Sequence, residues 1–285
     1  MNDRQKSDRK IRNVRKSRSE DIQKHKTGPS EDKGDKSSKK EHTTEPALVR
    51  LNKYIANSGV CARRAADDLI KAGSITVNGV VVTDMGIRIS PGDEVKYKGK
   101  KISSDKKVYI LMNKPKGFVT TTKDPHAEKT VMDLIKNIGP ERLFPVGRLD
   151  KNTTGLLVIT NDGDLASKLS HPRYNKKKIY HVWLDRPVSK NDLVTLAEGV
   201  KLSEKEIIAA DAASFPDLED KTQVGIEIHS GQNRIVRRMF ETLGYDVRKL
   251  DRVYYAGLTK KNLPRGKWRF LTDKEISILK KGNYS

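Results

Sequence analysis

The spacing of apolar and polar positions predicts a small first module over residues 47–105. The segments 49–59 and 62–73 are each expected to form a short helix, because each carries an apolar pattern that a glycine closes at the C-terminal end. Together with the strands that follow, the two helices are expected to make a small α+β unit of about 55 residues, from the element lengths typical of such units.

The strands of this module are predicted from turn signals. Two runs of β-branched residues, 75–77 and 80–82, flank Asn78-Gly79, which is a strong hairpin signal. A second hairpin is expected over 87–97, around Pro91-Gly92. The stretch 98–107 follows as the end of a strand and a linker.

Strand and helix patterns mix from Val108 onward, which predicts a larger α+β domain over 106–285 built on a mostly antiparallel sheet. Buried or alternating runs predict strands at 108–115, 156–162, 178–185 and 222–230, and amphipathic patterns predict helices at 130–138, 163–170 and 233–244. Trp183 and Trp268 are expected in the core of this domain.

Residues 1–46 differ in composition from both modules. Apart from Ile11, Val14 and Ile22 they contain almost no large apolar side chain, so they cannot bury enough surface to offset the entropy of ordering. We expect a disordered basic arm. It either adds non-specific phosphate contacts or is a solvated tail, and the sequence does not separate the two.

The charge of the chain indicates a polyanionic partner. Lys and Arg total 58 against 37 Asp and Glu, a net charge of +21. Residues 1–45 hold 14 of the basic and 9 of the acidic residues, so the folded part itself carries about +16. Nucleic acid is the commonest partner of so basic a domain.

The compartment is inferred from what the sequence lacks. Cys61 is the single cysteine, so no disulfide can form within the chain and a reducing compartment is expected. There is no apolar run long enough for a membrane helix and no apolar segment behind the basic N-terminus. We expect a cytoplasmic protein that does not bind membranes.

The first module carries a basic pair on each predicted helix. Arg50 and Lys53 are expected on one face of the first helix, and Arg63 and Arg64 open the second, where positive charge opposes the helix dipole unless it is shared with a phosphate. For a lone pair of arginines, a solvated basic face would be the better explanation. The pattern RLNKYIANSGVCARRAADDLIKAGSITVNG, however, closely resembles the S4-type RNA-binding domain over about residues 48–105.

This resemblance implies binding to structured RNA through shape and phosphate contacts. Arg50, Lys53, Arg63 and Arg64 are the expected RNA-binding residues. One departure is Ala62, where the family usually has a serine that could cap the second helix, and its loss concerns stability rather than function.

The second module contains an Arg-Leu-Asp triplet that ends at Asp150, in a loop just before a predicted strand. The triplet alone would favour a surface ion pair. Two later segments, KIY and NRIVRRM, change this interpretation, because the three in order closely resemble the motifs of the pseudouridine synthases of the RsuA type, which modify ribosomal RNA. The resemblance covers about residues 48–275, and an S4-type domain is the usual companion in that family.

The resemblance implies an isomerisation that moves uracil from an N–C to a C–C glycosidic bond, with a carboxylate as nucleophile. It implies roles for the following residues: Asp150 is the nucleophile, Arg237 its ion-pair partner, Tyr180 the ring that stacks on the target base, Val236 the apolar floor, and Arg148 the side chain that fills the gap left by the flipped nucleotide. Whether Asp150 attacks the sugar or the base stays open.

Two of these assignments have a second possibility, and the role of the two threonines after Asp150 is also open. The Tyr180 hydroxyl is also a candidate for the final proton removal. Arg237 could instead be one more phosphate contact beside Arg234 and Arg238. Thr153 and Thr154 either shape the catalytic loop or make a local turn bond to the backbone.

Metal and cofactor chemistry is not supported by the sequence. The six histidines show no ligand spacing with each other or with Cys61, and no glycine-rich phosphate loop is present. We therefore expect a cofactor-free enzyme, acting as a monomer. The ending KNLPRGKWRFLT looks closer to the RluB-like, large-subunit branch of the family, with a small-subunit target or a non-catalytic ribosome-assembly protein as alternatives.

Overall fold

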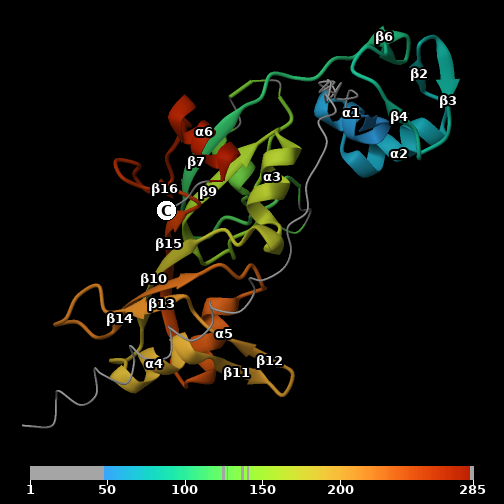
Figure 1. Cartoon of the computed structure of the whole chain (residues 1–285). Coiled ribbons are helices and arrows are strands. Elements are labelled where there is room, and N and C mark those ends of the chain that lie inside the picture. The colour runs from blue at the N-terminus through green and yellow to red at the C-terminus, as the bar shows by residue number, and fades with distance from the viewer. Residues whose placement is uncertain (1–47, 124–125, 127, 136–137, 140, 283–285) are drawn as a thin grey trace, which may run out of the picture. The chain divides into compact units, whose positions relative to one another are not determined.

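The computed structural model describes residues 48–123, 126, 128–135, 138–139 and 141–282. The basic arm expected at 1–46 lies outside the described residues. The described chain contains a small N-terminal part and a larger part built on a long sheet (Figure 1).

The small part has two helices and two small sheets. Its elements are β1 (Val49–Arg50), α1 (Leu51–Asn57), α2 (Arg63–Lys71), β2 (Ile75–Val77), β3 (Val80–Val82), β4 (Arg88–Ile89), β5 (Val95–Tyr97) and β6 (Lys100–Lys101). Strands β3, β2, β5 and β6 form one sheet in that order, and β1 pairs with β4. Leu51, Ile55 and Ile70 from the helices pack on Ile75 and Val95 from the sheet, which gives this part a core of its own.

The hairpin predicted at Asn78-Gly79 is confirmed. Both residues have positive φ, 50° and 85°, as the tight turn between β2 and β3 requires. The hairpin predicted over 87–97 is wrong, because β4 pairs with β1 and β5 pairs with β2. Two short strands beside a Pro-Gly turn look alike in sequence whether or not they pair with each other.

The larger part has mixed elements in an irregular order. They are β7 (Tyr109–Lys114), the 3₁₀ helix η1 (Val131–Ile135), β8 (Phe144–Pro145), β9 (Thr154–Thr160), α3 (Gly163–Ser170), the 3₁₀ helix η2 (Pro172–Tyr174), β10 (Lys178–Leu184), α4 (Lys190–Glu198), β11 (Val200–Ser203), β12 (Glu206–Ile208), β13 (Ala212–Ser214), β14 (Gln223–Ile228), α5 (Ile235–Thr242), β15 (Val247–Tyr255), β16 (Leu258–Thr259), β17 (Trp268–Phe270) and α6 (Asp273–Lys281).

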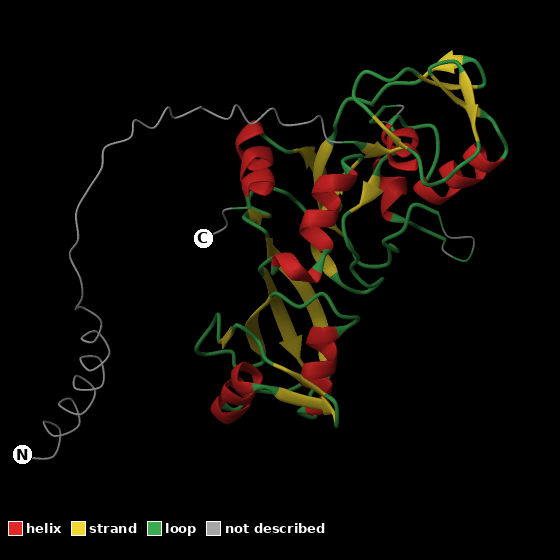
Figure 2. Ribbon diagram, turned by 45° about the vertical axis from the view of Figure 1, so that its right-hand side comes forward, coloured by secondary structure: helices red, strands yellow, loops and turns green. Residues whose placement is uncertain are grey.

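One nine-stranded sheet organises this part, in the order β13-β14-β10-β15-β9-β7-β17, with β16 on β15 and β8 on β9. Its described pairs are antiparallel except β15 with β9. The predicted α+β class with a mostly antiparallel sheet is therefore confirmed. Helices α3 and α6 lie by the β7–β9 end, and α4 and α5 lie by the β14–β13 end (Figures 1 and 2).

The sheet is buried on both faces at β7, the strand next to the edge strand β17. Ile110 and Met112 belong to one hydrophobic cluster, which includes α5 and η1, while Tyr109 and Leu111 belong to a second, which includes α3 and α6. This explains why β7 is a continuous apolar run rather than an alternating one.

Several expectations need correction. The helix predicted at 130–138 is only the 3₁₀ turn Val131–Ile135 within the described residues, and β15, the longest strand, was not predicted at all. Trp268 packs against the core as expected, but Trp183 is half-buried and belongs to none of the three hydrophobic clusters of the described chain.

Candidate active site

A pocket of about 130 Å³ brings together the motifs that lie far apart in the sequence. Its lining includes Arg148 and Asp150 from the loop before β9, Tyr180 from β10 and Val236 from α5. A larger hollow of about 520 Å³ adjoins it and shares Arg148 and Asp150. The site residues predicted from the three motifs therefore meet in one place, except Arg237, which is buried behind the lining.

The loop that carries Asp150 is held from below by a buried lysine. Lys114, at the end of β7, is fully buried, and its ammonium group donates to the carbonyl oxygens of Pro115 (3.2 Å), Asp150 (3.0 Å), Lys151 (3.3 Å) and Thr153 (2.8 Å). Burial lowers the pKa of Lys114 to about 8, while the negative charge of Asp150 opposes this shift. The ammonium group thus fixes the backbone of the loop and places a positive charge beneath it.

A threonine holds the same loop from its other end. The buried Thr120 hydroxyl donates to the Leu149 carbonyl oxygen at 2.7 Å and lies 3.3 Å from the Leu149 amide. The side chain of Asp150 is left half-buried at the pocket. A rigid backbone with a free carboxylate is the arrangement that a nucleophile requires.

The two threonines after Asp150 point to different partners. The Thr153 hydroxyl donates to the Asp150 carboxylate at 3.5 Å, a long contact, and the Thr154 hydroxyl donates to the Asp251 carboxylate at 2.9 Å. Neither hydroxyl makes a local turn bond to the backbone among the hydrogen bonds of the described chain. The backbone acceptor of the Thr154 hydroxyl is instead the distant Leu250 carbonyl oxygen, at 3.3 Å. A role of the two threonines in shaping the loop stays a prediction.

Arg237 lies close enough to Asp150 to feel its charge but makes no ion pair with it in the described chain. Its Nη1 donates to the Val247 carbonyl oxygen at 2.8 Å, and its Nε is buried with no partner among the described atoms. Burial, and then the charge of Arg234, lower the pKa of Arg237, and the charge of Asp150 acts in the opposite direction. A buried N–H without a partner is costly, so this group is available to an additional acceptor.

Tyr180 and two apolar side chains form the less polar wall of the pocket. Tyr180 is only 9% exposed and stands in the core face of β10, and Val236 and Leu250 line the pocket beside it. A buried ring flanked by aliphatic side chains is suited to hold a flat base.

Two further cations in this pocket were missed from the sequence. Arg252 of β15 is buried, and its Nε and Nη2 both donate to the Leu156 carbonyl oxygen, at 2.9 and 2.7 Å. Lys178 donates to the carbonyl oxygens of His229 (2.7 Å) and Ser230 (3.3 Å), and burial, with the charge of Arg252, lowers the pKa of Lys178 to about 8. Both side chains line the pocket and make it cationic.

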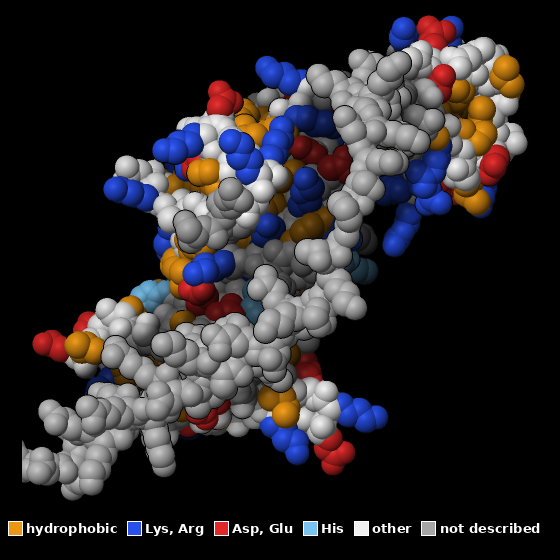
Figure 3. Space-filling model, viewed as in Figure 1, with side chains coloured by type: hydrophobic (Ala, Val, Ile, Leu, Met, Phe, Trp, Pro, Cys, Tyr) orange, Lys and Arg blue, Asp and Glu red, His pale blue; other side chains and the backbone are white. Residues whose placement is uncertain are grey.

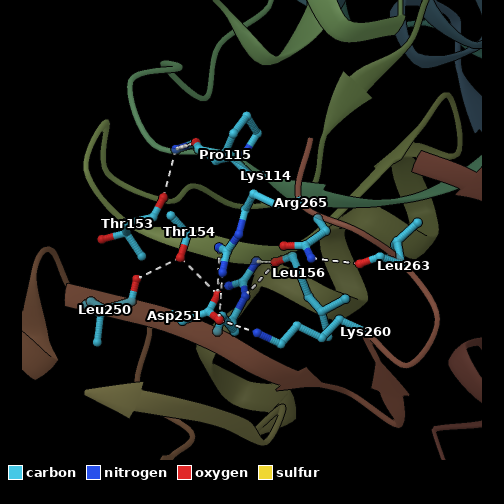
Figure 4. Close-up of polar contacts among 12 residues, drawn as sticks. Lys114, Pro115, Thr153, Thr154, Leu156, Leu250, Asp251, Lys260, Leu263 and Arg265 are labelled. Carbon is cyan, nitrogen blue, oxygen red and sulfur yellow. Dashed lines mark hydrogen bonds and ion pairs between the residues drawn. The ribbon is translucent and has the colours of Figure 1, made fainter. Parts of the chain in front are cut away.

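A polar network behind the catalytic loop ties β9 to β15 and to the C-terminal segment (Figure 4). The Asp251 carboxylate is 2% exposed, pairs with Lys260 and accepts from Arg265 Nη1 and Nη2 at 3.1 Å each. Burial raises the pKa of Asp251, but the hydrogen bonds from Lys260 and Arg265 outweigh it, so the net shift is downward. Thr154 connects this network to the loop that carries Asp150.

The expected RNA-binding residues lie on the first two helices and just before them. Arg50 precedes α1 with an extended backbone rather than lying in the helix, and Arg63 and Arg64 open α2; all three are exposed. Arg63 Nε donates to the Asn52 side-chain oxygen at 3.3 Å. The Lys53 ammonium nitrogen lies 2.6 Å from a carboxylate oxygen of Asp164, so part of its positive charge is already neutralised.

Neither a metal site nor a membrane-spanning helix is found among the described residues. They contain no group of three or more His, Cys, Asp or Glu side chains placed to hold a metal ion. Within the same ranges, no helix has both the length and the apolar character to cross a membrane.

Comparison with known families identifies two regions. The RNA pseudouridylate synthase model matches residues 108–242, and the S4 domain model matches residues 49–95. The first region contains Asp150, Tyr180 and Val236 of the pocket described above, whose lining also includes Leu250, Arg252 and Tyr255 beyond the match. The second region contains the two helices with the exposed arginines.

Known proteins are similar over most of the chain. Ribosomal large subunit pseudouridine synthase B of Bacillus subtilis (strain 168) is 42% identical over 236 residues, which is 82% of this chain and 96% of that protein. Dual-specificity RNA pseudouridine synthase RluF of Escherichia coli (strain K12) is 37% identical over 80% of this chain and 77% of its own length. A crystal structure of a pseudouridylate synthase superposes with a TM-score of 0.58 at 31% identity, covering 81% of this chain and 99% of that one.

Proposed function

The chain belongs to the RNA pseudouridine synthase family, within its RsuA type, and we propose that it converts a uridine of ribosomal RNA to pseudouridine at the pocket around Asp150. The observation that carries this proposal is the convergence of Asp150, Tyr180 and Val236 in one cationic pocket, although their motifs lie up to 86 residues apart. A merely structural role would not require a half-buried carboxylate over a backbone fixed by Lys114.

The reaction breaks the bond between C1′ of ribose and N1 of uracil and forms a bond from C1′ to C5 of the same base. The proton on C5 is then lost, and N1 gains a proton, so that no atom is added overall. Asp150 is the proposed nucleophile, and the Tyr180 ring stacks on the base with its hydroxyl as a candidate for the C5 proton removal. The reaction needs no redox or hydrolytic partner.

Arg237 is proposed as the ion-pair partner of Asp150. Its Nε is buried without a partner in the described chain, and the charges of the two side chains attract each other. Catalytic hydrogen bonds are often long in a ligand-free protein and tighten when the substrate closes the site. We therefore expect the direct pair to form once RNA is bound.

The target base must leave its helix before it can enter the pocket. Arg148 is exposed at the junction of the pocket and the adjoining hollow, where it can fill the space that the flipped nucleotide vacates. Thr153 is proposed to orient Asp150 within the same loop. Arg50, Lys53, Arg63 and Arg64 are proposed to contact RNA phosphates from the S4 domain.

Large-subunit RNA is the proposed substrate, because the relative at 42% identity is described as acting on the large ribosomal subunit. A small-subunit target remains the alternative. We propose domain limits of 47–105 and 106–285, with 1–46 as a basic arm, and we propose that the protein acts as a cytoplasmic monomer without a cofactor. A non-catalytic assembly protein would not need Asp150, Tyr180 and Arg237 together.

The proposal is tested by Asp150→Asn. This variant keeps the side-chain volume but removes the charged nucleophile, so tritium release from C5-labelled ribosomal RNA should be lost while circular dichroism and RNA affinity stay as in the wild type. Activity within about tenfold of the wild type would contradict the proposal, since a nucleophile cannot be replaced at so small a cost. Mapping pseudouridines in ribosomal RNA from cells with and without the protein would identify the nucleotide and the subunit.

A further inference from the structure

A separate pocket of about 330 Å³ lies across the catalytic loop from Asp150. Asn152 and Thr154 line this pocket, whereas Asp150 and Thr153 line the catalytic one. Lys151, between them, lines the hollow that adjoins the catalytic pocket. The loop is therefore flanked by recesses on both sides, and its exposed residues lie between them.

The register of the sheet places two side chains of this pocket, Trp183 and Lys249, on the other face of β10 and β15, while Leu250 lines both pockets. Val182 pairs with Leu250 on the face that carries the catalytic pocket, and Trp183 pairs with Lys249 on the opposite face. Successive side chains of a strand point to opposite faces, so Trp183 and Tyr180 face different sides of the sheet. Trp183 and Lys249 both line the second pocket.

Trp183 is unusual for a tryptophan in the middle of a sheet, because no hydrophobic cluster of the described chain contains it. Its ring stacks on the His181 ring, with centroids 3.7 Å apart and an angle of 24° between the planes, and the ammonium group of Lys249 lies 5.9 Å from the Trp183 ring. A partly exposed aromatic ring that is fixed by stacking on one side and has cations nearby can stack on a further planar group.

The charge around this ring is positive. The acidic residue in the lining is Asp251, and its carboxylate is already paired with Lys260 and Arg265. Lys116, Arg248 and Lys249 are exposed, and the ion pair that Arg248 makes among the described residues is a 3.9 Å contact with exposed Asp246. Lys and Arg side chains also appear at many points on the face drawn in Figure 3.

We propose that this pocket binds an unpaired nucleotide of the substrate RNA, with the base stacked on Trp183 and the flanking phosphates against Lys116, Arg248 and Lys249. Stacking on an aromatic ring requires a base that is free of its helix, and cations beside the ring follow the backbone of a single strand. The inference rests on the proposed function, in which the substrate is RNA. A strand that leaves the catalytic pocket over Lys151 and Asn152 reaches this ring next.

Binding is tested by tryptophan fluorescence of the full-length protein. Titration with a single-stranded hexauridylate should quench the emission of the wild type and have little effect on Trp183→Phe, in which Trp268 is the remaining tryptophan. Equal quenching in the two proteins, or none in either, would overturn the proposal, since stacking on Trp183 must quench that ring.

Catalysis gives a second readout with unmodified ribosomal RNA made by transcription. Trp183→Ala should raise KM about 5- to 150-fold at an unchanged kcat, which is the loss expected for one base–aromatic stack, and Trp183→Phe should restore most of it. The double variant Arg248→Ala, Lys249→Ala should raise KM and flatten its salt dependence, whereas Lys274→Ala, which removes an exposed lysine from α6, should do neither.

The outcomes separate the two levels of inference. A wild type that forms no pseudouridine contradicts the proposed function. An active wild type whose KM is unchanged in folded Trp183→Ala and in the double variant contradicts the second pocket alone. If Trp183→Ala does not fold, the double variant and the fluorescence comparison with Trp183→Phe decide.

Discussion

Arg237 shows how much of a side chain's role depends on burial rather than on sequence position. It is one of three arginines within five residues, but Arg234 pairs with exposed Glu241 and Arg238 pairs with Glu206, while Arg237 is 8% exposed and within the field of Asp150. A surface ion pair contributes little to stability. A buried cation near a pocket carboxylate interacts with it through a medium that screens charge less than water does.

We therefore expect Arg237→Ala to lower the rate of the chemical step more than the affinity for RNA. The charge of Asp150 acts on the buried Arg237 guanidinium, so loss of this cation should be felt at the reacting carboxylate rather than at the RNA-binding surface. Single-turnover rates at saturating enzyme measure this, with Arg238→Ala as the matched control that should stay near the wild type. If excess Arg237→Ala enzyme alone restores the full rate, Arg237 is a phosphate contact instead.

At the scale of single residues, the sequence predicted the site residues that belong to distinctive motifs. It missed the site residues whose role depends on burial in the folded protein. Asp150 and Tyr180 were predicted, and the structure brings them into one pocket. Lys114 and Arg252 were missed because the sequence does not distinguish a buried lysine or arginine from a solvent-exposed one. The signal that could have identified Lys114 is its position at the end of a fully buried strand, beside Pro115.

At the scale of the secondary-structure elements, β7 is connected to the catalytic loop by hydrogen bonds from one titratable side chain. Four carbonyl oxygens surround the ammonium group of Lys114, whose pKa burial lowers to about 8. The charged form offers three N–H donors and the neutral amine only two. Loss of the proton therefore leaves more of the loop carbonyls unsatisfied, and the loop that carries Asp150 should loosen.

We expect the turnover rate of the wild type to fall as the pH rises through about 8, the pKa that the structure gives Lys114. The sign follows from the group: Lys114 is protonated below this value, and its hydrogen bonds to the loop weaken above it. In Lys114→Arg the charge persists to much higher pH, so this fall should disappear even if the rate at neutral pH is reduced. An unchanged fall near pH 8 in that variant would assign it to another group, such as Lys178.

The parallel pairing of β9 with β15 could not be predicted from the sequence, for a different reason. A Cβ added at Gly155, where φ is +106°, would lie 2.6 Å from the backbone nitrogen of Arg252, so only glycine allows the parallel pairing of the two strands there. The sequence shows a glycine at the start of a strand but not which strand approaches it. The charged residues of β15 likewise hid the alternation that would have predicted it.

Across the described chain, the hydrophobic clusters divide into two groups that contain the family matches at 49–95 and 108–242 and extend beyond both. The cluster around Leu51 and Val95 consists of residues from 49–102 alone, and the other two clusters lie entirely within 108–279. Each module carries its own apolar pattern in the sequence, and the domain limits of 47–105 and 106–285 stay a prediction. Strand order was not predictable, since β10 pairs with β15 about 70 residues away and nothing local specifies that choice.

Because the catalytic part has its own hydrophobic cores, removal of residues 1–105 should leave this part folded but lower its affinity for RNA. The interactions removed are electrostatic, so the plot of log affinity against log salt concentration should become less steep. The slope should change by about 0.7–0.9 for each phosphate that is no longer neutralised. For exposed Arg50, Arg63 and Arg64 together the slope should change by about two to three. Circular dichroism and filter binding at several salt concentrations measure both effects, and turnover at saturating RNA should persist. Removal of residues 1–46 alone is the control for the arm and should change the affinity less. An affinity and salt slope equal to those of the intact chain would mean that the catalytic domain, with its cationic pockets, supplies the grip by itself.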